Sequence, residues 1–214
     1  MDTEERKISL SKGRQVSLTK GLSSLRVSVE WKPNTRARNS NQDFDIDLII
    51  VEAKSLGDNK FRCLSPDHLV FYGSYEQTDE GKFTDPQCAV IHSGDDRSGD
   101  GDGEECIVIP KKLDSAITDI FFIVNIYEGQ SRKQTFDLVK GLEVKVYEDG
   151  KDIPKLVYKL DEDDEFKGGT VLTLGNLTRE DRNKFKFTAI GESCNESLFQ
   201  VLTKYGLKFK EDNI

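Results

Sequence analysis

The amino-acid sequence predicts an all-β fold: a β-sandwich of two antiparallel sheets with a C-terminal amphipathic helix and few other helical turns. Short segments of alternating apolar and polar residues recur along most of the 214-residue chain, separated by turns rich in Gly, Asp and Asn. The segment 120–126 is apolar on both faces, which is typical of a central strand that is covered on both sides. Many short strands and few helices together favour two packed sheets.

The expected strands follow one another from the N-terminus. Ile8–Leu10 and Val16–Leu18 each alternate and are followed by a Lys-Gly turn, and 25–31 alternates without a break. The other strands are expected at 43–51, 69–72, 89–91, 107–109, 120–127, 142–148, 156–160, 171–174 and 185–190. Because no change of composition divides this series, we interpret residues 1–214 as one domain with short polar tails.

Helical periodicity is confined to two stretches. Apolar residues recur at helical spacing near the C-terminus, at Leu198, Val201, Leu202 and Tyr205. Ser193 and Glu196 fit a capping box before this helix, and Gly206 ends the pattern. A shorter helix is expected over 131–139.

The composition restricts the class of protein. Charged residues make up 33% of the chain, hydrophobic residues 36%, and the formal net charge is −8. Non-specific binding to nucleic acid needs a basic surface, so we expect no nucleic-acid partner and favour cations or basic partners. No segment approaches the length of a transmembrane helix, and the charged N-terminus lacks the apolar region of a secretory signal. We therefore expect no transmembrane segment and a cytoplasmic location.

The cysteines and histidines do not form a metal-binding motif. The cysteines are scattered along the chain, at Cys63, Cys88, Cys106 and Cys194. No two of them make a C-x-x-C pair, and His68 and His92 are the only histidines, so a zinc site is not expected. In a reducing compartment these cysteines should be free, partly buried thiols.

The most acidic segment is Ser93–Cys106, where Asp and Glu alternate with Gly. Glycines let the backbone fold back, and Ca²⁺ takes six to eight oxygen ligands, so the segment predicts a calcium loop. Residues 96–101 match the first half of an EF-hand loop, but the twelfth position is Ile107 in place of a bidentate Glu. Because the flanks are also expected to be strands, we exclude an EF-hand and expect Glu104 or Glu105 to supply the bidentate ligand.

A second acidic cluster lies upstream, where Asp43, Asp45 and Asp47 alternate with apolar residues. On a strand these carboxylates would share one face, about 7 Å apart, while Phe44 and Ile46 face the core. Like charges on one face repel each other, so a bound cation would stabilise them. Magnesium fits less well than calcium, because it keeps its waters and favours one or two carboxylates beside a phosphate.

Two long segments in a fixed order, 42–47 and 92–105, point beyond these general patterns. Further segments accompany them: 8–13, 16–21, Trp31, 69–72, 132–136 and 184–191. Together they resemble the TerD family of tellurium-resistance and general stress proteins, and 42–47 and 92–105 are similar to the family's two signatures. The resemblance covers roughly residues 8–207 of the chain.

This resemblance implies a β-sandwich that binds calcium through its acidic loops and has no established catalytic activity. It implies Ca²⁺ as the cofactor, with two ions expected. The implied ligands are Asp43, Asp45, Asp47, Asp95, Asp96, Asp100, Asp102, Glu104 and Glu105, with Glu128 as an additional ligand after a central strand. The implied function is a calcium-binding module of a stress response, of the tellurite or toxic-agent resistance type. Such a module would act as a sensor or scaffold and contact other proteins of a stress complex.

Two other functions remain open from the sequence. One is a metal-independent interaction module whose acids form a solvated face. The other is a hydrolase that uses a carboxylate pair such as Asp45 and Asp100. Neither histidine has an obvious partner, and the chain lacks the nucleophile-elbow, P-loop and metalloprotease motifs. We therefore expect the protein not to be an enzyme.

Overall fold

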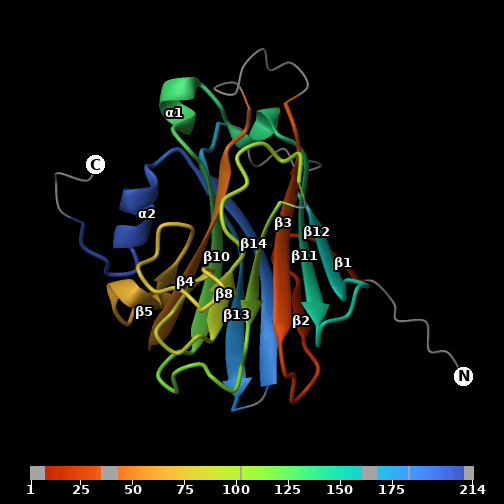
Figure 1. The fold of residues 1–214 in the computed structure, drawn as a ribbon, viewed down its shortest axis with the longest axis vertical. Coiled ribbons are helices and arrows are strands. Elements are labelled where there is room, and N and C mark those ends of the chain that lie inside the picture. Colours follow the sequence, from red (N-terminus) through yellow and green to blue (C-terminus); the bar gives the residue numbers. More distant parts are fainter. Residues whose placement is uncertain (1–7, 35–42, 102, 161–167, 183, 210–214) are drawn as a thin grey trace, which may run out of the picture.

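Two sheets packed face to face make up the fold, as the sequence predicts (Figure 1). The structure is a computed structural model that describes residues 8–34, 43–101, 103–160, 168–182 and 184–209. The first sheet has the strand order β1 (Ile8–Leu10), β12 (Leu156–Lys159), β11 (Lys140–Glu148), β3 (Leu25–Lys32), β9 (Glu104–Val108), β8 (Val90–His92), β7 (Phe83–Thr84). All its neighbours are antiparallel except β1 and β12, which pair in parallel at one edge.

The second sheet carries most of the long strands. Its order is β2 (Gln15–Ser17), β14 (Lys184–Cys194), β13 (Val171–Asp181), β10 (Asp119–Ile126), β4 (Ile46–Gly57), β5 (Lys60–Cys63), and β6 (Leu69–Val70) also pairs with β4. The central position predicted for 120–126 is confirmed, because β10 lies between β13 and β4 and residues 120–124 are all buried. The helical elements are η2 (Pro66–His68), α1 (Gly129–Arg132), η3 (Phe136–Leu138) and α2 (Leu198–Thr203).

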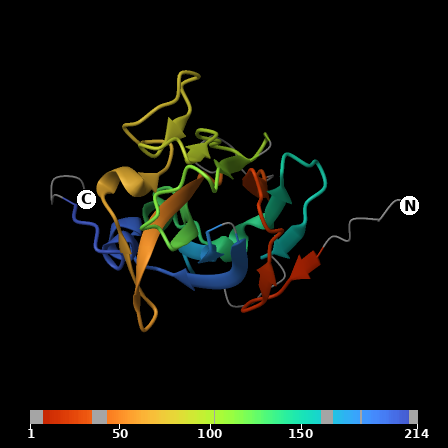
Figure 2. The same cartoon turned by 90° about the horizontal axis from the view of Figure 1, so that it is seen from below.

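The main core lies between the two sheets, and a smaller one covers the outer face of the second sheet. Alternate residues of β4 divide between them: Leu48 and Ile50 join the main core, whereas Ile49 and Val51 join the smaller one. The smaller core is closed by α2, which lies beside β4 and β5 (Figures 1 and 2). This arrangement explains why the first part of β4 is buried on both faces.

The cap of the C-terminal helix lies four residues later than predicted. Ser197 Oγ accepts a hydrogen bond from the Gln200 amide at 3.3 Å, and Gln200 Oε1 accepts one from the Ser197 amide at 2.9 Å. Ser193 and Cys194, which we expected at the cap, belong to β14 and pair with β13. The same Ser-x-x-Glu/Gln pattern occurs twice, and strand pairing decides which copy caps the helix.

Several other boundaries differ from the predictions. The helix expected over 131–139 is two separate turns, α1 and η3. The strands β5 and β7 were not predicted, because each is short and carries little alternation. The strand expected at 43–51 begins only at Ile46 and continues to Gly57. As a result, Asp43 and Asp45 precede the strand instead of lying on it.

The thiol prediction is confirmed, since all four cysteines are free. Burial raises the pKa of Cys63 to about 12 and raises that of Cys106 as well, so neither is a reactive thiolate at neutral pH. Within the part of the chain that the structure describes, no helix is long and apolar enough to cross a membrane.

Candidate metal centre

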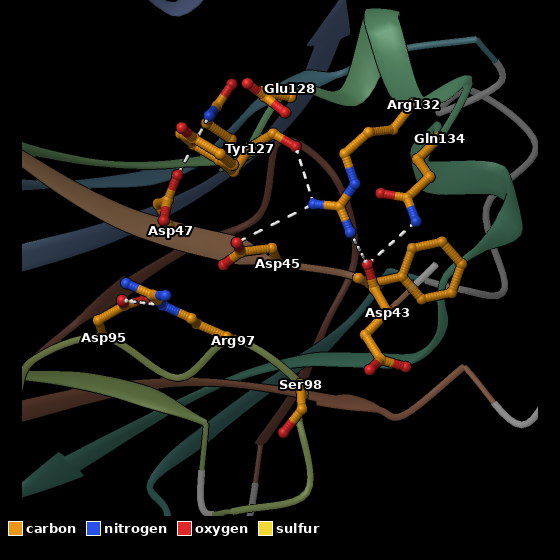
Figure 3. A network of polar contacts seen from close by, with 12 residues as sticks. Asp43, Asp45, Asp47, Asp95, Arg97, Ser98, Tyr127, Glu128, Arg132 and Gln134 are labelled. Atoms are coloured by element: carbon orange, nitrogen blue, oxygen red, sulfur yellow. Dashed lines mark hydrogen bonds and ion pairs between the residues drawn. The ribbon is translucent and has the colours of Figure 1, made fainter. Parts of the chain in front are cut away.

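Three of the predicted acids converge at one end of the sandwich. Each of Asp45, Asp47 and Asp95 offers a carboxylate oxygen, and these oxygens all lie within 4.8 Å of one another (Figure 3). We call these three residues the acidic triad. Asp45 and Asp47 flank the first residue of β4 in the second sheet, whereas Asp95 follows β8 in the first sheet. The triad therefore forms only because the two sheets are held together here.

Glu104 joins the two sheets beside the triad. It lies on β9 with no exposed surface, and its Oε2 accepts a hydrogen bond from the Leu48 amide of β4 at 2.6 Å. Its Oε1 accepts from the Asp96 amide at 3.1 Å. One buried carboxylate thus connects the start of β4 to residues 93–101, which we call the acidic loop. Glu104 is not among the described acids whose oxygens converge at the triad.

His92 makes a parallel connection from β8. Its Nδ1 accepts a hydrogen bond from the Gly94 amide at 3.0 Å, which places the ring proton on Nε2. Nε2 lies 3.0 Å from the Leu48 carbonyl oxygen and 3.3 Å from Glu104 Oε2. His92 and Glu104 together provide hydrogen-bond partners for the N–H and the C=O of Leu48. The neighbouring strand β6 pairs with Ile50 and Val51 and does not reach Leu48.

The acidic loop packs closely against Trp31 at Gly99. A Cβ atom at Gly99, whose φ is +72°, would lie 2.5 Å from Trp31 Nε1. Trp31 Nε1 in turn donates to the Phe44 carbonyl oxygen at 3.1 Å, next to Asp45. Asp96 Oδ1 accepts from the amides of Ser98 and Gly99, at 3.1 Å each, while its Oδ2 is buried without a hydrogen-bond partner among the described residues.

Two arginines flank the triad (Figure 3). Arg97 Nε donates to Asp95 Oδ2 at 2.8 Å, although the Arg97 side chain is 79% exposed. Arg132 is largely buried, and its guanidinium lies 4.0 Å from Asp45 Oδ2. Arg132 also donates to the carbonyl oxygens of Tyr127 and Asp43, and so links α1 to the segment before β4. Arg97 can move into solvent, whereas Arg132 is part of the framework.

The triad holds more negative charge than its surroundings stabilise. The pKa of Asp47 is raised to about 8, mainly by burial and also by the neighbouring charges of Glu104, Asp45 and Asp95, while a hydrogen bond from Asn125 opposes the shift. Burial also raises the pKa of Asp45 to about 6, with Asp95 adding to the effect and Arg132 opposing it. A cation placed among these oxygens would favour the ionised form of both carboxyl groups.

The other described acids that were predicted as ligands are not part of the triad. Asp43 uses its carbonyl oxygen to accept from Arg132 and Gln134, and Glu105 pairs with Arg26 at 3.1 Å on the opposite face of β9 from Glu104. The remaining acids are Asp96, which is anchored within the loop, Asp100 and Glu128, which are exposed, and Asp102, which lies outside the described residues.

The triad fits calcium in its donor chemistry. All its donors are carboxylate oxygens, and two oxygens bound to one Ca²⁺ at about 2.5 Å can lie no more than about 5 Å apart. The spacing of the triad meets this condition. Three carboxylates can provide up to about six of the required six to eight oxygens. Zinc is a poorer match, because both ring nitrogens of the nearby His92 are engaged by the protein.

Comparison with known proteins shows the family to which the chain belongs. The sequence profile of the TerD domain matches residues 7–205. The chain belongs to the TerD family. It is 32% identical to the tellurium resistance protein TerD of Serratia marcescens, over 94% of this chain and 97% of that protein. It is 31% identical to general stress protein 16U of Bacillus subtilis, over 94% and 98%.

Solved TerD-like structures share the fold. A homologue of the telluride resistance protein TerD from Streptomyces coelicolor superimposes with a TM-score of 0.61 at 21% identity, covering 86% of this chain and 96% of that one. At this identity the likeness concerns the sandwich alone. It confirms the predicted fold class independently of the sequence signatures.

Proposed function

We propose that the protein is a calcium-binding module of a stress response, in which Ca²⁺ binds Asp45, Asp47 and Asp95. The proposal rests mainly on the convergence of three carboxylates from two different sheets. The raised pKa values of Asp45 and Asp47 indicate that positive charge is lacking around these carboxylates. A bound Ca²⁺ would supply it. Relatives named for tellurium resistance and general stress support the stress-response part of the proposal.

The consequence of binding would be a fixed acidic loop. Asp95 is the member of the triad that comes from the loop, so a cation shared with Asp45 and Asp47 would fasten residues 93–101 to the start of β4. The ordered loop would offer a surface to a protein partner, as expected of a sensor or scaffold. Support for a second ion comes from the buried Oδ2 of Asp96 in the same loop, which has no hydrogen-bond partner among the described residues.

The hydrolase alternative receives less support. It requires Asp45 to work with Asp100, but among the described residues the acids that converge with Asp45 are Asp47 and Asp95. The names of the relatives describe resistance and stress proteins and give no enzyme class.

Calorimetric titration with CaCl₂ tests the proposal. Asp45→Asn removes one anionic ligand, and we expect about a tenfold or larger loss of affinity for Ca²⁺. Asp43→Asn is the matched control, because the same chemical change falls on an aspartate outside the triad. Equal affinity in all three proteins, or no binding heat with the wild type, would reject the triad as the calcium site. A parallel titration with MgCl₂ should give clearly weaker binding.

A further inference from the structure

A cavity of about 610 Å³ lies next to the triad, between β4, β10 and α2. Its volume is in the range of small-molecule sites. Much of its wall is apolar and is formed by Ile49, Leu69, Phe71, Leu198, Leu202 and Phe209. Asp47 belongs to both the triad and the lining of the cavity, so the apolar space ends at a buried carboxylate.

The charged residues that line this cavity in the described part of the chain all have the same sign. Asp47 and Glu128 are its only charged lining residues, and the described lining contains no Lys, Arg or His. Asp47 is 4% exposed and receives a hydrogen bond from Asn125 Nδ2 at 3.2 Å, which leaves capacity for further donors. An anionic ligand would therefore find no cationic partner in the described lining, whereas a cationic group would find a carboxylate in a desolvated setting.

Aromatic rings stand at the same end of the cavity. Tyr72 and Tyr127 line it together with Asp47. Tyr127, which is labelled near Asp47 in Figure 3, is 44% exposed, so this end is close to solvent. The faces of tyrosine rings attract organic cations, most strongly where water is excluded. An apolar body would occupy the space beside Leu198 and Leu202, with its charged end at Asp47.

We propose that this cavity binds a small organic cation, an amine with an apolar or aromatic body, whose ammonium group pairs with Asp47. The occupant follows from the sign of the lining charges, the rings beside them and the apolar remainder of the wall. This binding does not require calcium, so it stands apart from the proposed function, although both ligands would use Asp47.

Three probes of similar size and different charge test the proposal in calcium-free buffer. Calorimetry or NMR titration with 4-phenylbutylammonium should show saturable binding. The neutral 4-phenylbutan-1-ol should bind at least about tenfold more weakly, because an ion pair with a buried carboxylate is worth more than a neutral hydrogen bond. The anionic 4-phenylbutanoate should not bind. Equal binding of the alcohol, or tighter binding of the carboxylate, would overturn the proposal, as would no binding of the amine.

A pair of charge variants provides the control. Asp47→Asn removes the anionic partner and should weaken binding of the amine at least about tenfold. Asp43→Asn makes the same chemical change at an aspartate outside the described lining of the cavity and should leave binding unchanged. Equal binding of the amine by the wild type and Asp47→Asn would contradict the assigned charge, as would an equal loss in both variants. Because these titrations contain no calcium, their failure is distinguishable from failure of the calcium proposal.

Discussion

Glu52 is a glutamate in the core of the sandwich, and replacing it should stabilise the protein in a pH-dependent way. Its side chain on β4 follows Leu48 and Ile50 on the face that points into the main core, and it has no exposed surface. Both carboxyl oxygens are buried without a hydrogen-bond partner among the described residues. Burial raises the pKa of Glu52 to about 9, with Asp85 and Asp114 adding to the effect and Arg179 opposing it.

The sign and size of the effect follow from this pKa. Above about pH 4.5 the unfolded chain loses the Glu52 proton, while the folded protein keeps it up to about pH 9. The contribution of Glu52 to the free energy of unfolding is therefore fully present below pH 4.5. It falls by about 1.4 kcal/mol per pH unit between about pH 4.5 and pH 9. At pH 7 the loss amounts to about 3 kcal/mol. Glu52→Gln removes the proton equilibrium and hence this loss.

Urea unfolding of wild type and Glu52→Gln in calcium-free buffer measures the difference. Near pH 4.5 we expect similar free energies of unfolding, and at pH 7 the variant should be more stable by about 3 kcal/mol. Glu80→Gln, at an exposed glutamate, is the matched control and should follow the wild type at both values of pH. A difference between Glu52→Gln and wild type that does not change with pH would refute the reasoning.

Three further predictions concern the site. Glu104→Gln should lower the free energy of unfolding by about 1–3 kcal/mol, because it weakens a buried acceptor of two backbone amides. Urea unfolding measures this loss, and unchanged stability would contradict the role of Glu104. Gly99→Ala should destabilise by about 1–3 kcal/mol through backbone strain and contact with Trp31. Its control, Gly57→Ala, has a similar φ but open space around it and should cost less; equal costs would exclude the contact with Trp31. Calcium at about 100 times its dissociation constant should stabilise the wild type by about 2.7 kcal/mol, and a similar gain in Asp47→Asn would argue against the triad.

The fold could be predicted from the sequence because most of its strands show a local alternation of apolar and polar residues. The central strand at 120–126 and the apolar partners Phe44 and Ile46 were read correctly, since burial of one or both faces leaves a direct pattern in neighbouring residues. The parallel edge pair of β1 and β12 was not predicted. Such pairing joins segments almost 150 residues apart, and no local pattern records it.

The site was only partly predictable for the same reason. Asp45, Asp47 and Asp95 were among the expected ligands, but the contacts that bring them together were not predicted. His92 was interpreted as lacking a partner, and the contact of Glu104 with β4 was not predicted, because their common partner is the backbone of Leu48, far away in the sequence. A buried glutamate such as Glu52 also leaves no sequence signal, since a charged residue near the end of an apolar run is usually exposed.

The central claim is that calcium binds where the two sheets meet, and amide NMR during a calcium titration tests this most directly. In a ¹⁵N-labelled sample, we expect the largest shifts at the amides of Asp45, Asp47 and 95–98, with smaller changes at Leu48. Amides of β5 (Lys60–Cys63), which pairs with the far end of β4, should change little. Shifts confined to another acidic stretch, such as 161–165, or no saturable shift at all, would contradict the account.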